Sequence, residues 1–450
     1  MYRKLGLILI VVSTISFLFL YLRNRNEVEP TRFIDRLPDA DIIGRADVLE
    51  MATEFMPTLY YYKIPVREFV SPDFFLSQGK AYGIDFQTPL YFFGTESDEK
   101  IKDWGALIPV DDSSKVLDGI LAIGSVFDVR DTIIFDKKIY ISNSLNLAVS
   151  YGKDWLLVSS TKKFPRYLRH VIQAKRNSIS PRWKKFLNDE TFSDKPLVVR
   201  AISPRLKENG IESLLIAPTG DSTSITLNTR VTQFDSLSFQ LKEDGPNFDA
   251  EEYSNRTINA HFNIDRLRGN TSAPLYRLLE KVGKKVSFPL DEFLDAWGGD
   301  VAFRMGGIQK IKEEYIESEL DENFNVTEVV KYKEVKISGF SLYLSMNKRK
   351  KNFLTSIFQK GILTTEGKKM RLLYFPPMYM KDSDTSLLFH TGRYAPVVRT
   401  DSSHYGLWTF DYTPVSFSLD SAETKSIYGK VQIPLKKLIR DYLPETLEQE

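Results

Sequence analysis

The sequence predicts an α+β fold: an N-terminal transmembrane helix followed by two duplicated units of mainly antiparallel sheet, with helices packed on one face. Three observations support this prediction. The chain has 450 residues, enough for about two or three domains. Several segments alternate between apolar and polar residues, which is typical of strands with one buried face. Finally, similar segments recur in the same order in both halves of the chain, which indicates an internal repeat.

The first 32 residues are expected to form a membrane anchor and a linker. The run from Leu5 to Leu22 has no charged residue, and as a helix it would reach about 27 Å, close to the hydrocarbon thickness of a bilayer. Its bulky end lacks the small-residue site of a cleavable signal peptide. We therefore expect an uncleaved signal anchor and a single-pass protein of the bacterial inner membrane with its body in the periplasm. Basic residues flank the run on both sides, so charge alone leaves the orientation open.

The composition excludes several classes of protein. The chain has no cysteine, which rules out disulfide frameworks, zinc–thiolate sites, iron–sulfur clusters and thiol nucleophiles. Its net charge of +2 is too small to indicate a nucleic-acid partner. With 42% hydrophobic and 13% aromatic residues, the chain is also too apolar for a disordered protein.

The second half of the chain repeats patterns of the first. In each half a helical segment ends at a glycine close to an aspartate and is followed by an apolar strand. The matched segments begin at Ala46 and Ile264, at Tyr82 and Gly298, at Gly105 and Gly339, and at Leu147 and Leu387. We therefore predict one α+β unit over residues 33–250 and a second over 251–450.

Further elements follow from local patterns. Helices are expected over residues 114–121 and 350–358, and over 435–447 as a short closing helix. Alternation predicts strands at 225–231, 237–241, 415–419 and 427–433. The acidic stretch 307–336 has no counterpart of its length in the first half, so we expect an insertion that forms a protruding hairpin or a long surface loop.

The anchor, the segment Arg-Leu-Pro-Asp-Ala-Asp at residues 36–41, and the repeated order of helix, glycine–aspartate turn and strand resemble membrane-anchored envelope proteins of unknown function from Bacteroidota. The resemblance spans residues 33–450 and is one of pattern. It implies a location in the cell envelope and a repeated architecture. It brings no reaction and no catalytic residue to this chain.

Candidate catalytic residues are few. The four histidines, His170, His261, His390 and His404, have no metal-binding spacing, and the HExxH, GxSxG, Walker A and dinucleotide motifs are absent. We therefore expect structural or surface roles for all four.

The aspartates offer two more possible sites. Asp85 and Asp300 hold matched positions in the repeat, and two carboxylates in different environments can act as acid and base. Each, however, follows a helix-ending glycine, where an aspartate commonly serves a turn. The run from Asp111 to Ser114 could form a metal loop, but it also suits the N-cap of the helix that follows. We favour the turn and the cap, and expect no catalytic, cofactor-binding or metal-binding residue.

The strongest local feature is a basic segment. From Trp155 to Asn188 there is no Asp or Glu. Four aromatic residues are interleaved with the basic residues of this stretch: Phe164, Tyr167, Trp183 and Phe186. Its nine basic side chains are Lys162, Lys163, Arg166, Arg169, Lys175, Arg176, Arg182, Lys184 and Lys185. Such a pattern suits an anionic lipid surface, an acidic polysaccharide or an acidic protein. It also suits nucleic acid, which the expected export disfavours. A solvated helix face is the alternative that needs no partner.

These observations favour a membrane-tethered, non-enzymatic binding or scaffold protein of the bacterial cell envelope, active in assembly, secretion or surface maintenance. Its expected partners are the membrane, reached through residues 5–22, and an anionic lipid or an envelope protein. The alternative is a periplasmic carrier of lipid or another hydrophobic ligand, because the many Phe and Tyr residues could line an apolar groove. An enzyme with an unrecognised site is the third hypothesis.

Overall fold

The protein is described from a computed structural model, which divides into two compact units. Unit 1 comprises Met1–Phe234 and Gln432–Glu450, and unit 2 comprises Asp235–Val431. The structure describes residues 33–435 except 62–71, 98–99, 125–127, 176–177, 209, 222, 235–245, 248–254, 270, 272–273, 321–325, 368, 374, 376, 392–398, 401–403, 411–412 and 424. Four of the predicted features lie outside these residues: the expected anchor, the strand expected at 237–241, the closing helix after Leu435, and Arg176. Within the described part of the chain, no helix has the length and apolarity needed to cross a membrane.

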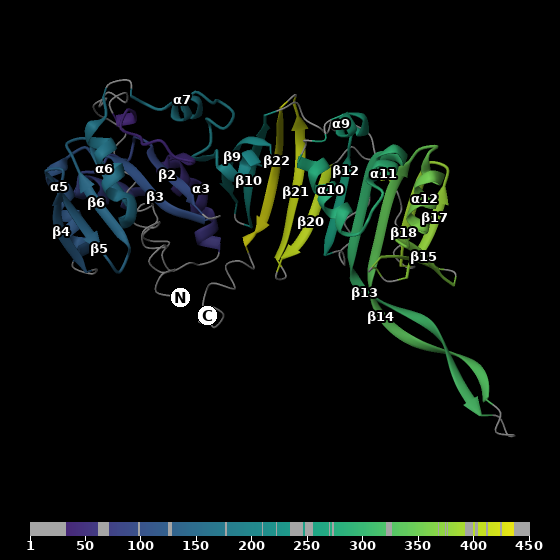
Figure 1. Cartoon of the computed structure of the whole chain (residues 1–450). Coiled ribbons are helices and arrows are strands. Elements are labelled where there is room, and N and C mark those ends of the chain that lie inside the picture. The colour runs from purple at the N-terminus through teal and green to yellow at the C-terminus, as the bar shows by residue number, and fades with distance from the viewer. Residues whose placement is uncertain are drawn as a thin grey trace. The chain divides into compact units, whose positions relative to one another are not determined.

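Unit 1 is built on antiparallel strands that pair in the order β4-β5-β6-β7-β3-β2-β1-β8-β9-β10 (Figure 1). Their bounds are β1 Ile42–Ala46, β2 Leu90–Ser97, β3 Lys100–Pro109, β4 Val129–Ile134, β5 Lys137–Ser142, β6 Leu147–Tyr151, β7 Trp155–Ser160, β8 Leu197–Ala201, β9 Ile211–Gly220 and β10 Ser224–Gln233. The strand expected at 225–231 is therefore confirmed. The fold class, α+β with a large antiparallel sheet, is confirmed as well.

Helices cover both faces of this sheet. The helices on one face are α3 (Val48–Tyr61), α4 (Pro72–Tyr82) and α5 (Ser113–Gly124), and those on the other are α6 (Phe164–Gln173) and α7 (Pro181–Leu187). The short helices η2 (Thr161–Lys163) and α8 (Pro204–Glu208) complete the unit. In β3, Ala106 belongs to the core under α3–α5, whereas its neighbour Leu107 belongs to the core under α6 and α7. The expectation of helices on one face is thus wrong for unit 1, because apolar residues in uninterrupted runs make a strand that is buried on both sides.

Unit 2 pairs its main strands in the order β17-β18-β14-β13-β12-β20-β21. The strand bounds are β11 Pro246–Asn247, β12 Arg256–His261, β13 Trp297–Leu320, β14 Val326–Met346, β15 Leu363–Glu366, β16 Lys369–Leu372, β17 Tyr379–Ser383, β18 Ser386–His390, β19 Arg399–Thr400, β20 His404–Phe410 and β21 Thr413–Ala422. A last strand, β22 Ser426–Pro434, begins in unit 2 and ends in residues assigned to unit 1. The helices are α9 Ile264–Gly269, α10 Pro274–Lys285, α11 Leu290–Ala296 and α12 Lys350–Gln359. Side chains of α9–α12 share one core with one face of the strands. The helix expected at 350–358 and the strands expected at 415–419 and 427–433 are confirmed.

The long strands β13 and β14 continue past the sheet of unit 2 as a two-stranded arm (Figure 1). From Ile308, which pairs with Ser338, to Leu320, which pairs with Val326, each strand of the arm pairs with the other. This region contains all of the acidic stretch 307–336 except Gly307, so of the hairpin and the long surface loop considered there, the protruding hairpin is confirmed. We call residues 308–338 the arm.

Candidate functional site

The basic segment folds into η2, α6 and α7 on one face of unit 1. The apolar residues of α6, Phe164, Tyr167, Leu168 and Val171, are buried at helical spacing against the sheet. This burial leaves Arg166 and Arg169, with Lys162 just before the helix, on the opposite and exposed side. The local sequence thus produces an amphipathic helix with a basic outer face.

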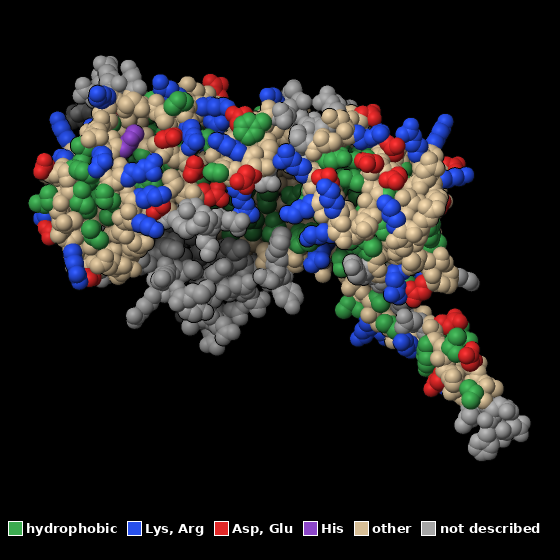
Figure 2. Space-filling view, in the orientation of Figure 1, with side chains coloured by type: hydrophobic (Ala, Val, Ile, Leu, Met, Phe, Trp, Pro, Cys, Tyr) green, Lys and Arg blue, Asp and Glu red, His purple; other side chains and the backbone are tan. Residues whose placement is uncertain are grey.

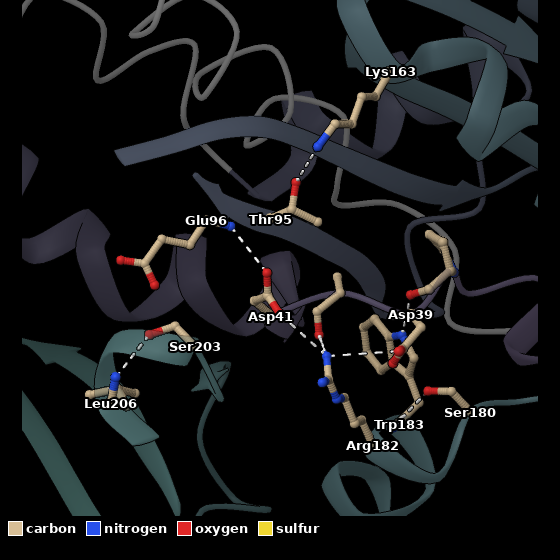
Figure 3. A network of polar contacts seen from close by, with 12 residues as sticks. Asp39, Asp41, Thr95, Glu96, Lys163, Ser180, Arg182, Trp183, Ser203 and Leu206 are labelled. Atoms are coloured by element: carbon tan, nitrogen blue, oxygen red, sulfur yellow. Dashed lines mark hydrogen bonds and ion pairs between the residues drawn. The ribbon is translucent and has the colours of Figure 1, made fainter. Parts of the chain in front are cut away.

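Helix α7 is fixed to the segment at residues 38–41 by its buried side (Figure 3). The Ser180 hydroxyl caps the helix by accepting a hydrogen bond from the backbone N–H of Trp183 at 3.4 Å. The guanidinium of Arg182 donates to the carbonyl oxygen of Ala40 at 3.0 Å and lies 3.4 Å from the carboxylate of Asp41. Arg182 therefore holds two parts of unit 1 together and is not free to bind a partner with its whole charge.

Two more of the nine basic residues also pair within unit 1. Lys163 Nζ lies 2.7 Å from the buried carboxylate of Asp103. It also lies 3.3 Å from the hydroxyl oxygen of Thr95 (Figure 3). Lys185 pairs with Glu212. Like Arg182, these two side chains have a structural role that their position in the sequence did not reveal.

The other described basic side chains point outwards. Lys162, Arg166, Arg169, Lys175 and Lys184 are exposed, and within the described residues the structure gives them no ion pair. In Figure 2, Lys and Arg side chains lie over the visible surface of unit 1, interspersed with Asp and Glu side chains. We call these five residues the basic face. Their uncompensated charge can attract an anionic surface, and salt should weaken that attraction.

An aromatic residue outside the basic segment completes this surface. The guanidinium carbon of Arg169 lies 4.8 Å from the ring centroid of Phe135, within the range of a cation–π contact. Phe135 belongs to the turn between β4 and β5 and is 42% exposed. Sequence reasoning missed it because the contact joins two segments that only the fold brings together.

A second polar cluster lies near the C-terminal end of α7. The Asp189 carboxylate forms a two-pronged ion pair with Arg230, one of whose contacts is 3.0 Å. Burial alone would raise the pKa of Asp189, but hydrogen bonds from Arg230 and Thr191 outweigh it and hold that pKa below its ordinary value. Arg200 is buried nearby, and burial lowers the pKa of its guanidinium.

Beside this cluster is an open cavity of about 350 Å³. It is lined by Arg45, Phe186, Leu187, Asn188, Asp189, Glu190, Phe192, Ser193 and Val198. Two of its charged side chains already have partners in the fold, because Arg45 donates to the carbonyl oxygen of Ser193 and Asp189 is held by Arg230. Most of the charged side chains that line the cavity are therefore already engaged within the fold and are not available to a ligand.

Unit 2 carries a buried pair of titratable groups. His261 Nδ1 lies 3.2 Å from the carboxylate of Asp300, and both side chains are buried. The pair joins β12 to β13, where the two residues stand opposite each other. The backbone N–H of Asp300 also donates to the Ser345 hydroxyl at 2.8 Å. The turn role expected for Asp300 is thus wrong, because Asp300 lies in β13 and its carboxylate faces His261 on the paired strand β12.

The other predicted polar roles are confirmed in detail. The Asp85 carboxylate accepts hydrogen bonds from the backbone N–H of Gln87 at 2.9 Å and from the Thr88 hydroxyl at 2.6 Å, as a turn aspartate does. Asp112 caps α5 by accepting from the backbone N–H of Ser114 at 3.0 Å. Hydrogen bonds from the side-chain hydroxyl and then the backbone N–H of Ser114 lower the pKa of Asp112.

The remaining histidines differ in surroundings. The ring of His170 lies 3.1 Å from the carbonyl oxygen of Leu37, and the ring of His390 lies 5.7 Å from that of Tyr379. His404 begins β20. Among the described residues, no group of three or more His, Asp or Glu side chains is placed to hold a metal ion.

Comparisons with known proteins give only a distant likeness. No protein-family model matches the sequence, and no curated protein matches it. Two crystal forms of the Treponema protein TP0453 are similar in structure at 10% and 9% sequence identity, each with a TM-score of 0.30. The matches cover 46% and 44% of this chain and 80% and 79% of the other. A likeness at this level supports no conclusion about function.

Proposed function

We propose that this chain is a membrane-tethered, non-enzymatic binding or scaffold protein of the bacterial cell envelope that holds an anionic partner on the basic face. The observation that carries the proposal is the set of five exposed basic side chains without ion pairs among the described residues. The proposal places the body in the periplasm, tethered to the inner membrane through residues 5–22.

We also propose that the two units arose by duplication, and the order of paired strands supports this. In unit 1, β2 lies between β1 and β3, and β3 pairs next with β7. In unit 2, β13 lies between β12 and β14, and β14 pairs next with β18. The segments beginning at Gly105 and Gly339 thus lie in corresponding strands. The match of Leu147 with Leu387 does not fit, because β7, and not β6, holds the place that corresponds to β18.

A duplicated scaffold with different surfaces on its two copies suits a protein that connects partners. The helices α6 and α7 belong to unit 1, and the arm belongs to unit 2. Each unit would then retain the shared sheet and offer a different binding surface, formed by α6 and α7 in unit 1 and by the arm in unit 2.

The test of the basic face uses the full chain in neutral detergent and three probes. These are nanodiscs of phosphatidylcholine, nanodiscs that also contain phosphatidylglycerol, and polygalacturonate as an acidic polysaccharide. The test variant combines Lys162→Glu, Arg166→Glu and Lys184→Glu. At about 1 kcal/mol per charge near an anionic surface, removing three charges should weaken binding about 100-fold, and reversing them should weaken it further.

The matched control carries the same change of charge elsewhere, through Lys281→Glu, Lys285→Glu and Lys351→Glu, which alter exposed residues of α10 and α12. It should bind both anionic probes nearly as well as the wild type. Equal binding by the test and control variants would overturn the proposal. Binding to phosphatidylcholine that persists at about 1 M salt would instead support the carrier of a hydrophobic ligand, because ions do not screen apolar burial.

A further inference from the structure

The turn between β4 and β5 carries a bulky apolar residue in a backbone conformation that such residues rarely adopt. Phe135 and Asp136 have φ values of +51° and +57°, so both central residues of this two-residue turn lie in the left-handed region. Asn-Gly and Asp-Gly are the usual residues here, since glycine and asparagine tolerate this region with little strain. A phenylalanine at this position opposes the most stable form of the turn.

The side chain does not compensate for this strain by full burial. Phe135 is 42% exposed, and Ile133, two residues before it, is 73% exposed. The neighbouring Ile134 packs against the core of unit 1 under α6 and α7, which fixes the hairpin on that core. The turn therefore displays two apolar side chains at a fixed place on the surface, and strain without a folding benefit is an indication of function.

The charges around the turn select the kind of partner. The hairpin's own charges nearly cancel: Asp131 lies 2.8 Å from Lys138, and Asp136 is adjacent to Lys137. The neighbouring helix then adds positive charge, because Arg169 lies over Phe135 and shares the exposed side of α6 with Arg166. An apolar tip with an aromatic ring and adjacent basic residues matches the interface of an anionic bilayer, where the rings enter the headgroup region and the basic groups contact phosphates.

We propose that the β4–β5 turn is a membrane-docking tip, in which Ile133 and Phe135 enter the interface of an anionic bilayer while Arg166 and Arg169 bind its headgroups. This inference rests on the proposed function, since it names anionic lipid as the partner of the basic face. It adds an apolar contribution that an acidic polysaccharide or a soluble acidic protein would not need.

The test uses the full chain in vesicles of phosphatidylcholine with or without phosphatidylglycerol. Because the chain has no cysteine, an Ile133→Cys variant can carry a single NBD dye, and a quencher attached to the lipid reports whether the dye enters the bilayer. A Leu278→Cys variant carries the control dye on α10, where Leu278 is 56% exposed. We expect quenching at position 133 only, and mainly in the vesicles that contain phosphatidylglycerol. Quenching equal to that of the control would overturn the proposal.

Replacing the phenylalanine separates docking from folding. In the dye-labelled chain, Phe135→Asn should reduce the ratio of quenched to unquenched dye about tenfold, because it removes most of an apolar side chain's transfer free energy. The same substitution should leave the unfolding midpoint unchanged or raise it, since asparagine relieves strain in the turn. The matched control Phe358→Asn removes a phenylalanine of α12 that is 37% exposed, and should not alter quenching. A loss of stability without a loss of docking would assign Phe135 a purely structural role and overturn the proposal.

The two proposals can fail separately. If the triple reversal on the basic face abolishes binding to anionic nanodiscs while the dye at position 133 stays unquenched, the proposed function stands and the docking tip is wrong. If the reversal has no effect on either anionic probe, the proposed function is wrong, whatever the turn does.

Discussion

The indole N–H of Trp183 donates a hydrogen bond of 2.8 Å to the carbonyl oxygen of Pro38, 145 residues away in sequence. The Trp183 side chain is fully buried, and its ring lies edge-on to the rings of Tyr91 and Phe186 at 5.8 and 5.7 Å. One side chain therefore joins α7, the segment before β1 and the sheet. Without these contacts, α7, which carries Lys184 of the basic face, would lose its fixed position.

We expect Trp183→Ala to lower the free energy of unfolding of the chain by about 3–5 kcal/mol, because it leaves a large cavity in a packed core. Trp183→Phe should cost less, since it keeps most of the apolar volume and loses the hydrogen bond to Pro38. Urea unfolding followed by circular dichroism measures both. Equal, small losses for the two variants would show that α7 is not held by this residue.

Two glycines with the same backbone angle provide a matched pair. Gly83 and Gly361 both have φ of +67°, so alanine at either should cost about 1–2 kcal/mol from the left-handed conformation. A Cβ at Gly83 would also lie 1.9 Å from the carbonyl oxygen of Asp112, whereas one at Gly361 would meet nothing within 4 Å. We expect Gly83→Ala to be clearly more destabilising than Gly361→Ala in thermal unfolding. Similar melting temperatures for the two variants would contradict the close approach of α4 and α5 at this glycine.

How well the sequence predicted the structure depends on the range of the interactions involved. The helix expected at 114–121 is α5 at Ser113–Gly124, and its cap at Asp112 was visible because a cap is local. The pairing of His261 with Asp300 was missed because it depends on the register of β12 with β13. The helices on both faces of unit 1 could have been expected from the run Leu90–Phe93. This run has no alternating polar residues, and such a strand is typically buried on both faces.

The candidate site was predicted only in part, for a similar reason. A stretch of basic residues is visible in the sequence, but its division into paired and exposed charges is not. Lys163 forms an ion pair with Asp103 on β3, and Lys185 forms one with Glu212 on β9. A signal for Phe135 was present, because the segment Ile-Ile-Phe-Asp-Lys-Lys places a short turn between two strands without the usual glycine or asparagine.

A pH dependence is expected from Asp221, which lies between β9 and β10. Hydrogen bonds from the side chain and backbone of Thr223, followed by those of Ser224, lower the pKa of Asp221 to about 2. An unfolded aspartate has a pKa of about 3.9. The folded state therefore gains stability from the charged form above about pH 4 and loses this gain as the pH falls towards 2.

The urea midpoint of the wild type should thus fall between about pH 4 and pH 2 by more than that of Asp221→Asn. Asp118→Asn, which removes an exposed carboxylate from α5, is the control and should behave as the wild type. Identical slopes for the wild type and Asp221→Asn would contradict the hydrogen-bonded state of this carboxylate.

The last prediction concerns the arm of unit 2. Among the arm residues that the structure describes, none belongs to the hydrophobic core of this unit. Phe340, just past the arm on β14, is buried in that core and contacts Phe303 with ring centroids 5.5 Å apart. The arm's cross-strand contacts include exposed pairs such as Lys331 with Glu317 at 2.8 Å, and exposed ion pairs contribute little to stability.

Replacing residues 308–338 with an Asn-Gly turn should therefore change the free energy of unfolding by less than about 0.5 kcal/mol, as expected for a change away from the core. Phe340→Ala should lower it by about 3–5 kcal/mol, because it opens a cavity in the core at the base of the same two strands. Urea unfolding of the full chain compares the two variants directly. A large loss of stability on removing the arm would mean that these strands support unit 2, and an unchanged value would leave the arm available for a role other than folding.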